Sequence, residues 1–168
     1  MERLLEVIFV SMKIKLMVVG KTNRPDLADW IENYAKRIKR YMPFEWVVVR
    51  DAKKTNKNNP EFIKNQEGIH ILNSLTPEDI LILFDERGKN YTSVAFSKFI
   101  EQKALQSTRG LVFCVGGAYG FSDKVRQRAN GLISLSAMTF SHQMIRIFAI
   151  EQIYRAMTII KNEPYHNS

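Results

Sequence analysis

Hydrophobic and polar positions divide the chain into alternating strand-like and helix-like segments. Short apolar runs predict buried strands at residues 13–19, 44–49, 80–84, 111–115 and 132–135. Apolar residues spaced three and four apart predict helices over 25–41, 61–73, 92–105 and 142–160, and polar residues after Ser122 indicate a shorter one over 122–130. This order predicts an α/β domain in which helices cover both faces of a mostly parallel sheet.

The helix over 92–105 is predicted to turn its apolar side chains toward the core. These side chains are Val94, Ala95, Phe99 and Leu105. The helix over 61–73 carries fewer apolar residues and is the weaker of the two predictions.

The predicted helix over 142–160 is apolar around almost its whole circumference. Its apolar residues are Met144, Ile145, Ile147, Phe148, Ile150, Ile153, Tyr154, Met157, Ile159 and Ile160. Such a helix must be buried on more than one side. Because a terminal helix lies outside the sheet in a domain of this size, we expect its second side to meet another copy of the chain in a homodimer. Glu151 and Arg155 stand four residues apart and are expected to form an ion pair.

The composition indicates one globular domain. The chain has 168 residues, of which 45% are hydrophobic and 11% aromatic, and this excludes a disordered chain. No apolar run approaches the roughly 20 residues of a membrane helix, so no membrane partner is expected. A single cysteine excludes a disulfide scaffold and favours the cytoplasm.

The first residues are interpreted as an appended segment. Met12 directly precedes the first strand-like run, and Glu2 and Glu6 interrupt any resemblance to a secretory signal. We therefore expect residues 1–11 to be an addition and residues 12–168 to form the domain.

Positive charge is concentrated in one stretch. The chain carries 25 Lys and Arg against 17 Asp and Glu, a net charge of +8. Residues 36–64 hold nine basic and three acidic residues, which gives 9 − 3 = +6. This stretch favours an anionic partner such as nucleic acid, although a solvated helix face followed by a polar loop has the same composition.

Candidate chemistry gathers where the predicted strands end, because open parallel sheets bind ligands beyond the carboxyl ends of their strands. These ends are residues 85–89, 116–121 and 136–142. Gly116 and Gly117 let the backbone approach a ligand closely, and a tight turn would need the same residues. The phosphate-binding patterns GxxxxGK[ST] and GxGxxG are absent.

Metal and cysteine chemistry are not indicated. The three histidines are scattered and none has metal-ligand spacing to another ligand, so we expect no metal. Cys114 lies inside an apolar strand and is interpreted as a packed thiol.

Several motifs together resemble one known family. The run 134–144, continuing through 151–155 to 164–166, is similar to the C-terminal signature of the ribosomal RNA large subunit methyltransferase H family, which belongs to the SPOUT class. Residues 12–21, 85–89 and 115–120 match as well, so the resemblance spans 12–166.

The resemblance implies a fold, a reaction and partners. The fold is a SPOUT-type α/β knot, whose C-terminal part forms a trefoil knot. The reaction transfers a methyl group from S-adenosyl-L-methionine to N3 of a pseudouridine in 23S rRNA of the ribosome. The enzyme acts as a homodimer.

The resemblance also implies site residues. The cofactor contacts carried over by motif are Phe84, Gly116, Leu135, Ser136, Ala137, Met138, Thr139 and Phe140. The family more often has Leu where Phe84 stands, and Phe keeps the apolar wall but changes how an adenine ring packs against it. Most members have Pro where Ser141 stands, so the resemblance does not fix the shape of that loop.

Catalytic roles follow from the reaction, which must remove the N3 proton. Arg155 is the first candidate, as a stabiliser of negative charge on a ring carbonyl. His166 and Tyr165 are candidates for positioning the base or accepting the proton, and His142 is a second candidate. Two other functions fit the sequence: a non-catalytic ribosome-binding assembly factor, and a SPOUT methyltransferase acting on tRNA.

Overall fold

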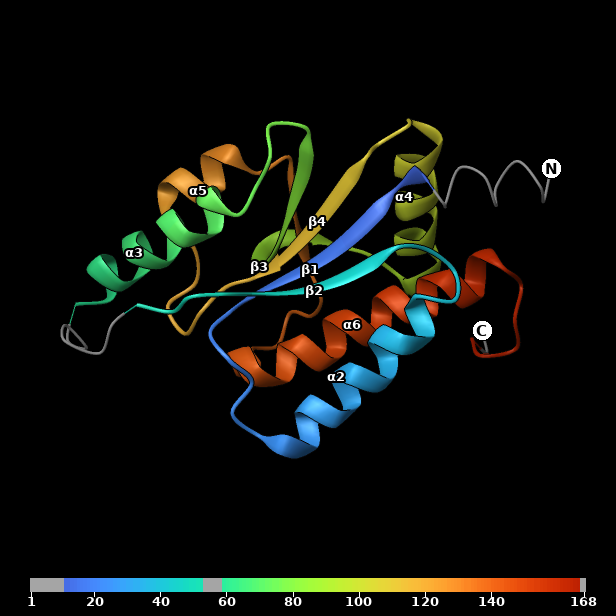
Figure 1. The fold of residues 1–168 in the computed structure, drawn as a ribbon, viewed down its shortest axis with the longest axis horizontal. Coiled ribbons are helices and arrows are strands. Elements are labelled where there is room, and N and C mark those ends of the chain that lie inside the picture. The colour runs from blue at the N-terminus through green and yellow to red at the C-terminus, as the bar shows by residue number, and fades with distance from the viewer. Residues whose placement is uncertain (1–10, 53–58, 167–168) are drawn as a thin grey trace.

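The computed structural model describes residues 11–52 and 59–166, coloured in Figure 1. The expected appended segment lies outside the described residues except for Ser11, as does most of the basic loop after β2. The elements of the described part are β1 (Lys13–Val19), α2 (Pro25–Ile38), β2 (Phe44–Val49), α3 (Pro60–Asn73), β3 (Asp79–Asn90), α4 (Ser93–Leu105), β4 (Gly110–Val115), α5 (Asp123–Arg128), β5 (Gly131–Ser134) and α6 (His142–Ile160).

The strands form one parallel sheet in the order β2-β1-β4-β3-β5. The register pairs Val18 of β1 with Val115 of β4, and Val115 with Phe84 of β3. The carboxyl ends of these strands therefore lie at the same edge of the sheet. The predicted parallel α/β sheet is confirmed, and the trefoil knot stays a prediction.

Helices cover both faces of the sheet, as predicted. On one face, α6 packs against α2 and α4; on the other, α3 packs with α5 (Figure 1). Each face has its own apolar core. Fully buried β4 residues supply both cores, because Leu111 and Phe113 point to the first and Val112 and Cys114 to the second.

The predicted core face of α4 is right for Phe99, which packs against the core, and wrong for Val94 and Leu105. Val94 and Leu105 are 39% and 53% exposed, whereas Phe96, Ile100 and Ala104 are buried. The buried residues stand four apart and form the stripe that meets α6 and the sheet. Phe96 packs against Phe113 of β4 with ring centroids 5.5 Å apart, and this contact fixes the rotation of the helix.

The strand β3 is longer than predicted. The sequence indicates a strand that ends at residue 84, but β3 continues to Asn90. Its pairing with β5 changes register between Phe84 and Lys89. The residues between them bulge out of the ladder, which carries Asp85 and its neighbours to the edge where the other strands end.

Candidate active site

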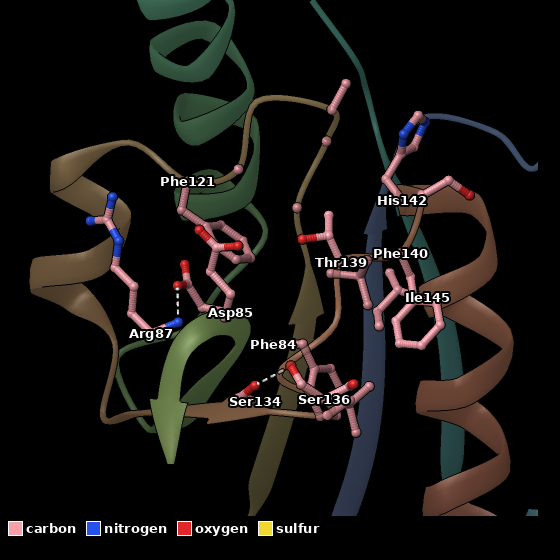
Figure 2. A pocket seen from close by; sticks show the side chains of 18 of the residues that line it. Phe84, Asp85, Arg87, Phe121, Ser134, Ser136, Thr139, Phe140, His142 and Ile145 are labelled. Carbon is pink, nitrogen blue, oxygen red and sulfur yellow. Dashed lines mark hydrogen bonds between the residues drawn. The ribbon is translucent and has the colours of Figure 1, made fainter. Parts of the chain in front are cut away.

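A cavity of about 460 Å³ opens at the carboxyl edge of the sheet (Figure 2). Three segments surround it: the bulge of β3, the turn after β4 over residues 116–121, and the loop between β5 and α6. Its volume lies within the roughly 300–1,000 Å³ of small-molecule pockets. The three strand ends that the sequence singles out therefore converge on one site.

Most of the cofactor-contact residues predicted from the sequence line this cavity. They are Phe84, Gly116, Leu135, Ser136, Met138, Thr139 and Phe140. Ala137 belongs to the same loop but does not line the cavity. His142 lines it from the first turn of α6, and Ile145 lies one turn further along the same helix (Figure 2).

Local hydrogen bonds give the loop between β5 and α6 its shape. The Ser134 hydroxyl donates to the Ser136 carbonyl at 2.8 Å, and the Ser136 hydroxyl accepts from the backbone N–H of Met138 at 2.9 Å. Ser141, where the family more often has Pro, caps α6 by accepting from the Met144 N–H at 3.3 Å. The loop thus enters α6 in a defined geometry without a proline.

The turn after β4, here called the glycine turn (residues 116–121), forms the second wall. Gly120 has a φ of +75°, a conformation that favours glycine. Its N–H donates to the Gly117 carbonyl at 3.1 Å and closes the turn. A Cβ at Gly116 would lie 3.3 Å from the backbone of Gly120 and from the ring of Phe121. The turn is therefore folded tightly, and its three glycines line the cavity with backbone that carries no side chain.

An ion pair that sequence reasoning missed lies on the opposite side of the cavity. The Arg126 guanidinium of α5 contacts the buried Asp85 carboxylate at 2.5 Å. Asp85 also accepts from the Arg87 N–H at 3.0 Å, which fixes the bulge of β3. No spacing rule connects residues 41 positions apart. Only the position of Asp85 at a strand end could have indicated a role for it.

The first turns of α6 are bound to the segment that follows β1. The fully buried Arg146 donates to the carbonyls of Val19 and Gly20 at 2.5 and 3.0 Å, and to the Thr22 hydroxyl at 3.0 Å. Gln143 donates to the Lys21 carbonyl at 3.3 Å. These contacts hold the segment around His142 in place.

His142 has a lowered pKa. Burial of the imidazole is the main cause, and the positive charge of Arg146 adds to it. The protonated form is disfavoured, so the ring is neutral at neutral pH and takes up its proton at a lower pH than an ordinary histidine. A neutral imidazole can accept a proton inside the cavity.

We predict that the NMR titration of the His142 imidazole has its midpoint below the ordinary value of about 6.5. The measurement follows ring C–H shifts from pH 8 downward, with His142→Asn to identify the signal. A midpoint at or above the ordinary value would contradict the described environment.

The other predicted catalytic residues gather at the far end of α6 and do not line the cavity. Arg155 donates to the Glu151 carboxylate at 3.0 and 2.6 Å, which confirms the expected ion pair. Its guanidinium lies 3.4 Å from Nδ1 of His166 and 4.8 Å from the ring centre of Tyr165. Residues 142 and 155 are 13 positions apart, so this cluster is about 20 Å from the start of the helix.

Tyr165 is held as a neutral phenol. Burial raises its pKa well above the usual range, and hydrogen bonds to Tyr34 and Glu151 raise it further. The hydroxyl donates to Glu151 at 3.1 Å and lies 3.4 Å from the hydroxyl of Tyr34. Within this chain Tyr165 is therefore a hydrogen-bond donor and a packing surface, and its role in the reaction stays a prediction.

Three further observations concern the cysteine, metal binding and membrane insertion. Cys114 is fully buried in β4 and burial raises the pKa of its thiol, which confirms the interpretation of a packed residue. Within residues 11–52 and 59–166, no cluster of three or more His, Cys, Asp or Glu side chains is arranged to hold a metal ion. Over the same residues, no helix has the length and apolar character needed to span a membrane.

Comparison with known proteins identifies the family. The family described as "Predicted SPOUT methyltransferase" matches residues 12–166. The chain is 48% identical over 156 residues to ribosomal RNA large subunit methyltransferase H of Flavobacterium psychrophilum and 50% identical to that of Parabacteroides distasonis. Each match covers 93% of this chain and 99% of the relative. The chain therefore belongs to the SPOUT methyltransferases, in the family of ribosomal RNA large subunit methyltransferase H.

Solved structures support the fold. A crystal structure described as a methyltransferase, from Bordetella pertussis Tohama I, superposes with a TM-score of 0.54 at 10% identity, covering 92% of this chain and 99% of that one. A methylase family protein from Neisseria gonorrhoeae gives 0.51 at 14% identity, covering 96% and 88%. At these identities the likeness concerns the fold alone.

Proposed function

We propose that this protein transfers a methyl group from S-adenosyl-L-methionine to N3 of a pseudouridine in 23S rRNA of the large ribosomal subunit, and that it does so in the cytoplasm as a homodimer. The observation that carries the proposal is the cavity where three strand ends meet, lined by the loops that the family motifs occupy. Relatives that share about half of its residues over nearly their full length support the choice of substrate.

The residues around the cavity fit S-adenosylmethionine. Phe84 stacks on Phe113 with centroids 5.5 Å apart and gives a rigid apolar wall for an adenine ring. Leu135 and Ile145 extend the apolar lining. At Gly116, Gly117 and Gly120 the backbone of the glycine turn offers polar groups at close range, because these residues have no side chain. When bound, this cofactor supplies a methyl group on a sulfonium that is a good leaving group.

Groups of the chain supply the rest of the chemistry. The N3 proton of the uracil ring must leave, and negative charge develops on the neighbouring carbonyls. The Arg155 guanidinium, always charged, stabilises that negative charge. The neutral imidazole of His142 accepts the proton, and His166 holds the orientation of Arg155 through their 3.4 Å contact. Tyr165 supports the cluster from the other side by packing against Arg155.

The two groups of site residues come together when two copies pair. Within one chain the cavity and the Arg155 cluster lie about 20 Å apart along α6. The outward side of α6 between them carries Met144, Ile147 and Phe148, which are only partly covered, and Phe148 is 39% exposed. Burying this apolar stripe against a second copy would bring the C-terminal tail of one chain to the cavity of the other.

Basic residues near the tail are proposed to hold rRNA phosphates. Tyr41, after α2, donates to Glu163 of the tail, so the end of α2 lies beside the Arg155 cluster. Lys39 and Arg40 are exposed at this end, whereas Lys36 pairs with Glu32. Such contacts give an affinity that depends on salt and carries no sequence information.

One experiment separates this proposal from the two alternatives. Radiolabelled S-adenosylmethionine is incubated with the protein and with ribosomes that lack the modification, and the labelled nucleoside is mapped. We expect label in 23S rRNA as N3-methylpseudouridine. Label in tRNA would identify the tRNA enzyme instead. Calorimetry that detects no binding of S-adenosylmethionine would favour the assembly factor.

A further inference from the structure

A buried carboxyl group lies behind the glycine turn, outside the residues that line the cavity. Glu67 stands in the middle of α3, on the opposite face of the sheet from α6, and is only 6% exposed. Within the described residues, its Oε2 atom has no hydrogen-bond partner. A buried polar atom without a partner costs stability, so its presence needs an explanation.

The Glu67 carboxyl touches the turn at Gly117. A Cβ added to Gly117 would lie 2.4 Å from Glu67 Oε2 and 3.0 Å from its Cδ. The carboxyl therefore occupies the space where a side chain at position 117 would stand. Because Gly117 also lines the cavity, the backbone of the glycine turn lies between Glu67 and the cavity.

The next residue of α3 contacts Ser122, which follows the glycine turn directly and precedes α5. A Cβ on Gly68 would lie 2.4 Å from the Ser122 hydroxyl and 3.2 Å from Val125 of α5. Two consecutive residues of α3 thus pack against the glycine turn and against the start of α5 that follows it.

Groups from several elements surround the Glu67 carboxyl and act on its pKa. Burial raises its pKa, and Asp51 after β2 raises it further. The backbone of Ala52 and the positive character of His70 on α3 oppose the shift. The group is thus held between the end of β2 and the glycine turn.

We infer that Glu67 is a positioning residue for the cofactor cavity: its carboxyl packs behind Gly117 and fixes the shape of the glycine turn that faces S-adenosylmethionine. The inference rests on the proposed function and deepens it. Glu67 itself does not touch the cofactor. Its contribution is to the affinity for S-adenosylmethionine, not to the transfer step.

The test measures S-adenosylmethionine affinity by calorimetry for the wild-type dimer and for Glu67→Asp, Glu67→Ala and Glu67→Gln. Shortening or removing the side chain takes the carboxyl away from Gly117, and we expect the Kd to rise roughly tenfold or more. Glu67→Gln keeps the shape and is expected to stay within about threefold of wild type. In methyl-transfer assays KM for the cofactor rises while kcat is nearly unchanged. The exposed Glu61→Ala on the same helix is the control.

A double-variant cycle shows whether Glu67 acts through Gly117. In Gly117→Ala the new methyl group collides with Glu67, and in the Glu67→Ala/Gly117→Ala double variant it does not. We therefore expect the double variant to bind no more weakly than Gly117→Ala. The inference would be overturned if the rise in Kd of the double variant equalled the product of the rises in the two single variants. It would also be overturned if Glu67→Asp bound S-adenosylmethionine like the wild type. If the wild type itself binds no S-adenosylmethionine, the proposed function fails instead.

Discussion

Replacing Arg155 by alanine is expected to slow methyl transfer to ribosomes by roughly 100- to 1,000-fold, the usual effect of removing one donor that stabilises transition-state charge. The Kd for S-adenosylmethionine should be nearly unchanged, because Arg155 does not line the cavity. Single-turnover rates at saturating cofactor and calorimetry give the two quantities. The same pattern, with a smaller loss of rate, is expected for His166→Ala.

Two further variants test whether the loss of rate is due to the guanidinium of Arg155. Arg155→Lys keeps the positive charge but loses the planar guanidinium, which reaches Glu151 with two nitrogens. We therefore expect its methyl-transfer rate to lie between that of Arg155→Ala and that of the wild type. Arg109→Ala removes an exposed arginine at the opposite edge of the sheet, before β4, and should behave as wild type. Wild-type turnover in both Arg155→Ala and His166→Ala would remove the proposed role of the cluster.

Placing a charge on the outward stripe of α6 is expected to prevent the proposed dimer from forming and to abolish methyl transfer. Ile147 lies on this stripe and is partly covered within one chain. In Ile147→Glu a carboxylate would have to be buried without a partner at the proposed interface, which costs several kcal/mol. Light scattering should report a monomer, and activity should be lost because the cavity and the Arg155 cluster then stay about 20 Å apart.

Ile69→Glu is the matched control for this prediction. Ile69 is 46% exposed on α3, on the other face of the sheet from α6. The same change there should leave both the dimer and its activity intact. A dimeric, active Ile147→Glu protein would show that the outward side of α6 is not the interface.

Local sequence pattern predicts the place of the site because strand ends are local features. The apolar runs of β3, β4 and β5 end where the cavity begins, and parallel pairing brings these ends together. The rotation of α4 could not be predicted in this way. Its apolar residues occupy more than one side, and the contact of Phe96 with Phe113 decides which side is buried.

The contacts that support the site depend on the tertiary fold. A glutamate within a polar helix is ordinarily exposed, so nothing in the sequence places Glu67 behind Gly117. Arg126 and Asp85 meet only because α5 lies beside the bulge of β3. Arg155, Tyr165 and His166 meet at the end of α6, about 20 Å from the cavity that they are predicted to serve.

A mixed dimer tests most directly whether the active site is shared between two copies. Thr139→Trp fills the cavity from an exposed loop position, and Arg155→Ala removes the charge on α6. Each variant alone is expected to be inactive. The two are co-expressed with different tags, and the dimer that carries both is purified and assayed for methyl transfer to 23S rRNA. If the tail of one copy completes the cavity of the other, this dimer retains one intact site and roughly half the wild-type rate. A mixed dimer as inactive as its parents would contradict the account.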